Sequence, residues 1–518
     1  MAAKKPPVIV WLRNDLRLED NPALHAAETA AESTGRQTLL VYIHDPAGHG
    51  PAGQDSAGQD SEGQDSKIQD RIRNTAQCWA PGGASNWWLH HSLIAFNKSL
   101  KTIDNRLRVF SGNAKQVLQT IVDETSADTL FWNRCYEPDS IARDSDIKKF
   151  FIERHLNVTS YPGNYCHEPW QIRREGKHPY RVFSAYWRAS LKQDSLPVSK
   201  TIQKLPTTRA ALKGEVKIKS LDLLPTQNWD SQFVDYWKPG EATAQLLVDE
   251  LLSNKIDEYD SSRDIPAIEG TSRLSPHLAF GEISPRQINA AIGSRLQQGT
   301  LLASDDTECF LREIGWREFA NHLLYHFPAT TSQPLDSRFA NFPWLKIEPA
   351  NLHRWQQGNT GIPLVDAGMR QLWQTGWMHN RVRMVVGSLL IKNLGYHWLE
   401  GARWFWDTLV DADLASNTMG WQWVAGSGAD AAPYFRVFNP VRQGERFDPE
   451  GIYVKRWVPE LQSLPRKYIH APWTAPADVL SNANIELGNH YPVPIVDLAS
   501  SRKEALSRFD KIKQAHAT

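Results

Sequence analysis

Residues 8–24 read VIVWLRNDLRLEDNPAL, an apolar run that passes through a polar stretch into an alanine-rich, helix-forming segment. This alternation of strand-like and helix-like segments repeats along the first part of the chain. Strands are predicted at 8–12, 38–44, 107–110, 129–132 and 158–161, and helices at 21–33, 86–103, 114–123 and 139–155. Because such alternation forms a parallel sheet with helices on its faces, we predict a doubly wound α/β domain over residues 1–165.

One segment interrupts this domain. At residues 46–66 the sequence Gly-Gln-Asp-Ser occurs three times, at 53–56, 58–61 and 63–66. It has few apolar groups to bury, so we predict a mobile loop. No G-x-G-x-x-G follows the first strand, so the usual dinucleotide fingerprint is absent.

The rest of the chain has a different organisation. Residues 166–235 have scattered prolines and few periodic runs, and we predict a connector that wraps between two domains. Residues 236–518 are predicted to form an all-helical domain. Its helices are expected at 242–252, 284–297, 308–326, 364–374, 381–394, 402–409 and 501–515. Ten of the 21 tryptophans lie within 316–423, which fits core packing and also stacking on flat ligands or electron transfer.

Composition excludes several classes of protein. The chain has 518 residues, 41% of them hydrophobic, with 58 basic and 58 acidic side chains. This apolar content excludes whole-chain disorder, and zero net charge excludes a generally basic coat but not a local basic patch. Four widely spaced cysteines argue against a disulfide scaffold or a cysteine-rich zinc site. With no long apolar run and no secretory signal, we expect a cytoplasmic, monomeric protein without a metal and outside the membrane.

Short polar blocks in a fixed order distinguish this sequence. Each block alone could have a purely structural role. Residues 271–275, TSRLS, are typical of a helix cap, and the two aspartates of 411–413, DAD, would suit a helix N-terminus. The blocks are WLRNDLR and EDNPAL at 11–24, EYDSSR at 258–263, EGTSRLS at 269–275, LREIGWREF at 311–319, GWMHNRVRM at 376–384, DADLASN at 411–417, GWQW at 420–423 and AAPYFR at 431–436. In this order, over roughly residues 8–475, they resemble the photolyase/cryptochrome family.

The resemblance implies an N-terminal antenna domain and a C-terminal helical domain that binds FAD. It is nearest to the class I-type bacterial enzymes, which repair cyclobutane pyrimidine dimers in UV-damaged DNA with light, using reduced anionic FAD. Asn380, Met384 and Asn417 match that group, whereas (6-4) enzymes typically have a second His in place of Asn380. The alternative is a blue-light signalling cryptochrome that keeps FAD without repair. A bacterial cytosol or nucleoid location follows from the same resemblance.

The cofactor residues are carried over from the matching blocks. Hydroxyls and N–H groups at a helix start can hold a phosphate, with charge added by Arg273. Asp413 would accept from the flavin N3–H, Asp411 would pair with Arg383, and Asn417 would face N5. The full set is Tyr259, Thr271, Ser272, Arg273, Leu274, Ser275, Phe310, Arg383, Asp411, Ala412, Asp413 and Asn417.

The resemblance also places a lesion cavity above the flavin. A stacked base cannot reach buried chemistry, so the dimer must flip out of the duplex. Trp316 and Trp423 would form apolar walls, while Glu313 would hydrogen-bond the thymine edge. The catalytic set is Glu313, Trp316, Asn380, Met384 and Trp423, and the electron-transfer set is Trp421, Trp398 and Trp344. The DNA-binding set is Arg263, Glu313, Trp316, Arg317, Asn380, Arg381, Trp423 and Arg436.

An antenna chromophore, 5,10-methenyltetrahydrofolate or 8-hydroxy-deazaflavin, is also implied. The segment Tyr136–Ser140 stands where one known folate site lies but lacks its Asn-Glu pair. Residues 83–89, GASNWWL, are similar to other folate-binding members. The sequence leaves the identity of this chromophore open.

Overall fold

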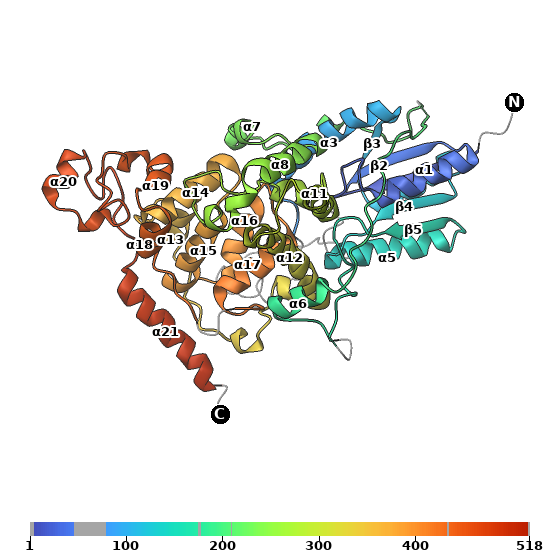
Figure 1. Ribbon diagram of the computed structural model, residues 1–518. Helices are drawn as coiled ribbons and strands as arrows, with labels where there is room; N and C mark the ends of the chain where they lie inside the picture. Colours follow the sequence, from blue (N-terminus) through green and yellow to red (C-terminus); the bar gives the residue numbers. More distant parts are fainter. Residues whose placement is uncertain (1–4, 46–78, 175–177, 209, 432–434, 516–518) are drawn as a thin grey trace.

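The computed structural model describes residues 5–45, 79–174, 178–208, 210–431 and 435–515. The predicted repeat loop at 46–66 and Cys78 lie outside these ranges. Figure 1 shows the strands gathered in the N-terminal part and a helical assembly over the rest of the chain. In the described ranges no helix is long and apolar enough to cross a bilayer.

A five-stranded parallel sheet forms the centre of the N-terminal part. Its order is β3-β2-β1-β4-β5, and every neighbouring pair is parallel. The strands are β1 Val8–Leu12, β2 Thr38–His44, β3 Leu107–Ser111, β4 Thr129–Asn133 and β5 Asn157–Tyr161. Strand β1 is buried at all five residues, as expected for a parallel strand covered on both faces.

Two helical layers cover the sheet. Val8, Val10 and Leu12 pack in one cluster with α1 (Pro22–Thr34) and α3 (Gly83–Leu100). The alternate side chains, Ile9 and Trp11, pack with α4 (Ala114–Thr125) and α5 (Pro138–Ile152) in another. The doubly wound arrangement predicted from the sequence is therefore confirmed.

The crevice where the strand order reverses, between β1 and β4, is filled by polar side chains. Ligands of doubly wound folds commonly bind at this point. Here Asn133 donates to Asp15 and Asn21, both at 2.7 Å. Arg13 reaches across to Asp144 at 2.9 Å. These side chains are bonded to one another, which agrees with the missing glycine fingerprint.

The second part of the chain is helical, as predicted. Helices α14, α15, α16 and α17 contribute to one large hydrophobic cluster, and α12 packs against α17. The helices are α8 Glu241–Asn254, α9 Tyr259–Ser262, α10 Ser275–Ala279, α11 Pro285–Gln297, α12 Asp305–His326, α13 Pro349–Gln356, α14 Pro363–Thr375, α15 Asn380–Ser388, α16 Trp398–Thr408, α17 Leu414–Ala425, α18 Pro440–Phe447, α19 Ile452–Trp457, α20 Ala477–Asn482 and α21 Leu498–Ala515. The helix predicted over 381–394 continues from α15 into a π-helical turn at Leu389–Asn393.

The connector has more structure than its sequence suggests. It contains α6 (Phe183–Ser190) and the short α7 (Phe233–Tyr236). The Phe183 ring stacks on Trp316 of α12, with centroids 3.7 Å apart and planes 10° apart. Residues 166–235 therefore contribute to the wall of the helical part. The boundaries at 165 and 235 remain predictions.

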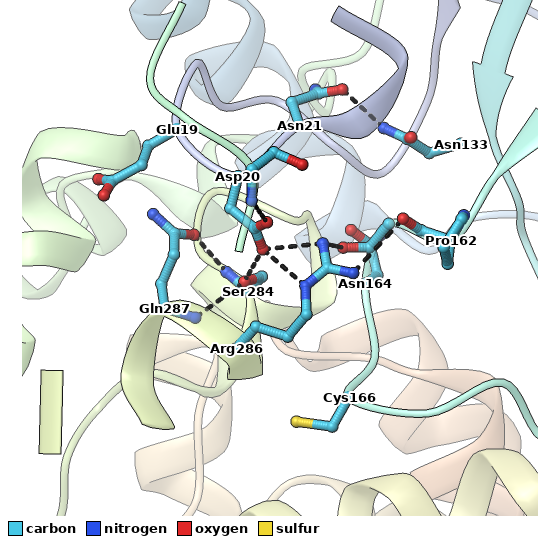
Figure 2. A network of polar contacts seen from close by, with 12 residues as sticks. Glu19, Asp20, Asn21, Asn133, Pro162, Asn164, Cys166, Ser284, Arg286 and Gln287 are labelled. Atoms are coloured by element: carbon cyan, nitrogen blue, oxygen red, sulfur yellow. Dashed lines mark hydrogen bonds and ion pairs between the residues drawn. The ribbon is translucent and has the colours of Figure 1, made fainter. Parts of the chain in front are cut away.

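A buried ionic network joins the two parts (Figure 2). The Asp20 carboxylate, fully buried after β1, accepts from Arg286 Nε at 2.8 Å and from Ser284 Oγ at 2.5 Å. Arg286 also donates to the Gly163 carbonyl at 2.9 Å. Gly281 approaches so closely that a Cβ there would lie 2.0 Å from the Asn14 oxygen. These contacts place the start of α11 directly against the loop after β1.

Candidate functional site

An internal cavity of about 530 Å³ opens in the helical part. All twelve predicted cofactor residues line it, and so do the five predicted catalytic residues and Trp421. They come from α9, α10, α12, α15, α17 and the segments between them. The fold therefore gathers residues from 259 to 424 around one space, which is of the size usual for a cofactor pocket.

One end of the cavity is built on a buried carboxylate. Asp411, with its side chain 4% exposed, accepts from Arg383 Nη2 at 2.8 Å, as the resemblance implied. It also accepts from Ser275 Oγ at 2.7 Å. Arg383 Nε donates to the Met378 carbonyl at 2.7 Å. This set ties α10, α15 and the loop before α17 into one wall.

The segment 271–275 has a different geometry from the one expected. Arg273 adopts a left-handed backbone with φ +57°. Its guanidinium pairs with Glu269 at 3.0 Å and lies 4.2 Å from the Trp377 ring centroid. The Arg273 charge is thus already partly neutralised. The hydroxyls of Thr271 and Ser272 remain on the cavity wall.

Helix α17 presents one face to the cavity. Asp413 is its N-cap and accepts from Ser416 N at 2.7 Å through Oδ1, which is the capping role that a helix start favours. Asn417 donates its amide to the Ala402 carbonyl at 3.0 Å, so that its Oδ1 is left as an acceptor. Trp421 follows one turn later and is buried against Gly401, where a Cβ would lie 2.0 Å from the indole.

These residues fit a flat aromatic cofactor with a polar tail. The Trp421 Nε1 atom is buried without a hydrogen-bond partner in the described residues. Phe310, Leu278 and Trp421 supply apolar walls, while Asp411, Asp413 and Asn417 supply acceptors. An isoalloxazine ring needs this combination, because its faces are apolar and one edge bears the N3–H donor.

The cavity mouth is aromatic and ionic. Trp316, stacked on Phe183, lies on one side, and Trp423, whose Nε1 donates to the Asp430 carbonyl at 3.1 Å, also lines the cavity. Glu313 is expected to hydrogen-bond a thymine, but here its Oε1 lies 2.5 Å from Arg263 Nη1. The carboxylate is 33% exposed on its side chain and ion-paired. Arg381, on α15, pairs with Asp264.

His379, in the GWMH block, has a structural role that the sequence reasoning missed. Its Nδ1 accepts from Arg381 N at 3.2 Å and caps α15. Burial lowers the pKa of His379 to about 4, so the ring is neutral and can accept at this nitrogen. A histidine directly before a helix start is the sequence signal for such a cap.

The four predicted DNA-binding arginines lie in different environments. Arg263 lines the cavity and Arg381 follows the lining residue Asn380, and each has a carboxylate partner. Arg436 is exposed and lies 5.8 Å from the Phe438 ring. Arg317 instead donates to the carbonyls of Asn164 and Leu278 at 2.8 and 3.1 Å. This placement ties Arg317 to the interface between the two parts, although the residue also lines the cavity, and its contact with DNA remains a prediction.

The three predicted relay tryptophans lie in different environments. Trp421 lines it, Trp398 is buried at the start of α16, and Trp344 is partly buried. His397 lies between the last two, 5.7 Å from Trp398 and 5.0 Å from Trp344 by ring centroids. Phe405, 4.9 Å from Trp421, is a neighbour that the sequence did not indicate. The relay itself remains a prediction.

The two segments considered for an antenna differ in the structure. Beside Tyr136 and Glu137 the hollow measures about 70 Å³, far below the ~300 Å³ of a typical ligand pocket. Residues 83–89 form the first turns of α3, where Trp87 and Trp88 are buried in the core under the sheet. In this structure both indoles pack against protein.

Comparison with known proteins agrees with this architecture. Residues 8–207 match the family described as DNA photolyase, and residues 310–511 match the FAD binding domain of DNA photolyase. A deoxyribodipyrimidine photo-lyase from Agrobacterium fabrum is 43% identical over 99% of this chain and 100% of its own length. The chain belongs to the photolyase/cryptochrome family.

The chain is similar to both cryptochromes and photolyases within this family. Cryptochrome-2 of Arabidopsis thaliana is 36% identical over 98% of this chain and 79% of its own length. A crystal structure of a bacterial class III photolyase from Agrobacterium tumefaciens superposes with a TM-score of 0.87 at 43% identity, covering 99% of each chain. The predicted family, fold and FAD-binding domain are thereby confirmed. The class I-type prediction is not, because this structural relative is of class III.

Proposed function

We propose that the protein repairs cyclobutane pyrimidine dimers in UV-damaged DNA in a light-dependent reaction. The observation that supports this most directly is a single cavity that joins the predicted cofactor residues to an aromatic mouth with Glu313, Asn380 and Met384. When bound in its reduced anionic form, FAD supplies the photoexcited electron that opens the cyclobutane ring. The electron returns afterwards, so the reaction is redox-neutral and belongs to the deoxyribodipyrimidine photo-lyases.

The chain's own residues bind and orient both molecules. Asp413, whose Oδ1 caps α17, would accept from the flavin N3–H through its other oxygen, and Asn417 would offer its amide toward N5. A neutral amide tolerates either protonation state there, whereas a carboxylate would repel a reduced, anionic ring. Arg383, which is paired with Asp411, would stand near the ring and offset its negative charge.

The mouth receives the flipped dimer. Trp316, held rigidly by Phe183, and Trp423 provide flat apolar surfaces for two pyrimidines and exclude water from the cavity. Asn380, at the N-terminus of α15, can hydrogen-bond a base edge. Because base stacking tolerates any sequence, recognition should follow the shape of the lesion and not the bases around it.

A signalling cryptochrome is the second candidate. The observation that favours it is the 36% identity to an Arabidopsis cryptochrome over 98% of this chain. Trp316 and Met384 favour the enzyme, since both line the mouth where a dimer would sit.

The deciding experiment is repair of a thymine-dimer oligonucleotide by the chemically reduced protein under blue light. We expect restoration of thymine in the light and none in darkness. A matched oligonucleotide with a (6-4) photoproduct should stay unrepaired. If the protein bound no FAD and repaired neither lesion, the proposal would be contradicted and neither candidate would be favoured. If it bound FAD tightly without repair, the cryptochrome would be favoured. Mass spectrometry of released chromophores would identify a folate or deazaflavin antenna, and sedimentation would test the expected monomer.

A further inference from the structure

A histidine occupies the gap between the last two tryptophans of the predicted relay. In the part of the chain that the structure describes, Trp398, at the start of α16, and Trp344, before α13, make no ring contact with each other. The His397 imidazole contacts both, with its centroid 5.7 Å from the Trp398 ring and 5.0 Å from the Trp344 ring. Its plane is inclined by 28° to that of Trp398, so these two rings are stacked. An electron that moves between the two indoles would cross this ring.

The backbone fixes the position of the imidazole. His397 is the N-cap of α16, and its Nδ1 accepts from Leu399 N at 3.2 Å. The segment before it is joined directly to the Trp344 segment, because Leu345 N donates to the Gly395 carbonyl at 2.9 Å. Gly395 has φ +71°, and a Cβ there would lie 2.8 Å from the Leu345 side chain, so glycine is needed for this approach. The contact between His397 and Trp344 is thus held by both chain segments.

The imidazole is neutral. Burial lowers the pKa of His397 to about 4, and the Arg403 charge acts in the same direction. Because Nδ1 accepts from a backbone N–H, the single proton of the neutral ring is on Nε2. A positive charge 5.0 Å from Trp344 would disfavour the removal of an electron from that indole on the order of 100-fold, at an effective dielectric constant of about 20. A neutral ring at this place leaves the oxidation of Trp344 unopposed.

Helix capping alone does not explain a histidine at this position. The side chains favoured at an N-cap are Asn, Asp, Ser and Thr, which are small and supply an oxygen acceptor but no ring. The other aromatic neighbour of Trp344 in the described ranges is Phe342, at 4.5 Å and 49°, and its further ring contacts are with phenylalanines. His397 is therefore the ring that connects Trp344 to Trp398.

We propose that His397 is a neutral bridge for the last electron step of the relay, from Trp344 to oxidised Trp398. The inference rests on the predicted relay within the proposed light-dependent function, and it adds a residue to that relay. One electron leaves the Trp344 ring and fills the vacancy on Trp398. No covalent bond changes and no proton passes through His397, since Nδ1 is engaged and Nε2 already bears a hydrogen. A thiol reductant in solution then returns one electron to Trp344.

The test separates the ring from the helix cap. Flash spectroscopy on the protein with oxidised FAD bound follows the lifetime of the oxidised tryptophan, and steady blue light with a thiol gives the rate of flavin photoreduction. His397→Asn keeps an acceptor for Leu399 N but removes the ring, so most of the long-lived tryptophan signal should be lost and photoreduction should slow. His397→Phe keeps a neutral ring without the acceptor. It should restore both signals toward those of the wild type, although its melting temperature should fall.

A charged variant tests the neutrality of the bridge. His397→Arg keeps a flat group that stacks on indoles but adds a permanent charge, so the yield of oxidised Trp344 should fall on the order of 100-fold. Phe342→Leu is the matched control, because it removes an aromatic contact of Trp344 that does not lead to Trp398, and it should leave both signals unchanged. Circular dichroism checks that each variant is folded. His397 does not line the cavity, so chemically pre-reduced His397→Asn should repair a dimer as the wild type does.

Several results would overturn the assignment. A wild-type lifetime and photoreduction rate in His397→Asn would make His397 a helix cap only. A loss in His397→Phe equal to that in His397→Asn would show that the ring is not what matters, and an equal loss in Phe342→Leu would assign the effect to packing around Trp344. An undiminished yield in His397→Arg would contradict the neutral bridge.

Failure of the underlying proposals would look different. If the relay does not operate, Trp421→Phe would photoreduce at the wild-type rate. If the protein does not repair dimers, the pre-reduced wild type would leave a thymine dimer intact under blue light, while the tryptophan signals would still report on His397.

Discussion

Arg263 Nη1 lies 2.5 Å from Glu313 Oε1, and both side chains line the mouth of the cavity. Arg263 also contacts Cys309 Sγ at 3.3 Å, one turn before Glu313 on α12. The carboxylate that is expected to contact the dimer is thus held by a guanidinium that is expected to contact a phosphate. A phosphate that binds Arg263 would compete with Glu313, and Glu313 would become free to turn toward the base.

We expect Glu313→Gln and Glu313→Ala to lower repair more than binding. Binding is shared among phosphate contacts and two aromatic walls, whereas negative charge on the dimer exists only after electron transfer and is stabilised then. The Gln variant keeps a donor and should fall between wild type and Ala. Quantum yield and dissociation constant are to be measured on one duplex; a many-fold loss of binding with unchanged splitting would make Glu313 a binding residue.

Trp421→Phe should block photoreduction of oxidised FAD while pre-reduced enzyme still repairs. Phe keeps an aromatic ring against Gly401 but is much harder to oxidise than indole. Absorbance changes under blue light, with and without an external reductant, measure the effect. Trp373→Phe, at a surface indole 44% exposed that does not line the cavity, serves as the control. A normal photoreduction rate in Trp421→Phe would remove Trp421 from the relay.

Asp411→Asn should weaken FAD binding about 5- to 100-fold, because the change leaves the Arg383 guanidinium without its charged partner. Ser275→Ala, which removes one hydrogen bond to the same carboxylate, should have a smaller effect. Both are measured by titrating stripped protein with FAD and following flavin fluorescence. Unchanged affinity in Asp411→Asn would contradict the assignment of this wall to the cofactor.

Glu318 provides a pH test of the contact between connector and helical part. Its carboxyl accepts from Cys166 N at 3.0 Å, and burial raises its pKa to about 7. The folded protein therefore keeps a proton on Glu318 that the unfolded chain loses near its ordinary pKa of 4.5. The contribution of Glu318 to the free energy of unfolding is therefore fully present below about pH 4.5 and is lost as the pH rises toward 7.

Comparison with Glu318→Gln separates this effect from that of the buried histidines. Burial lowers the pKa of His322, for example, to about 4, so its contribution to stability is lost as the pH falls and not as it rises. The melting temperature of the wild type should fall relative to that of the Gln variant between pH 5 and 7, by the equivalent of about 1–3 kcal/mol. Parallel profiles for the two proteins would show that Glu318 does not titrate in this range.

The sheet could be predicted from the sequence almost residue by residue. Strands β1 and β2 have the predicted bounds because buried parallel strands are continuous apolar runs with polar ends. The cavity residues could be assembled only through the resemblance, since nothing local in Asp411 or Ser275 indicates that they meet. The connector helix α6 was missed because its eight residues show too little periodicity, and its support comes from Trp316, more than 120 positions later.

Ion pairing was the least predictable feature. Glu313 could be placed on the correct helix, but its partner Arg263 lies 50 positions earlier, directly after α9. Arg317 could equally have faced DNA or protein, because a side chain's direction on α12 depends on the angle at which the helix packs. Only the fold places its guanidinium on the Asn164 and Leu278 carbonyls.

The buried Asp20 network has a consequence for recombining this protein with its relatives. Removing one partner of a buried ion pair commonly costs about 3–5 kcal/mol, while replacing the whole group can be neutral. A chimaera that joins the sheet of one member to the helices of another must therefore transfer Asp20 together with Ser284 and Arg286. In such a chimaera the loop after β1 and the start of α11 should come from the same parent protein, although 264 positions separate them. The junctions between the two parents should be placed where no such buried contact is divided.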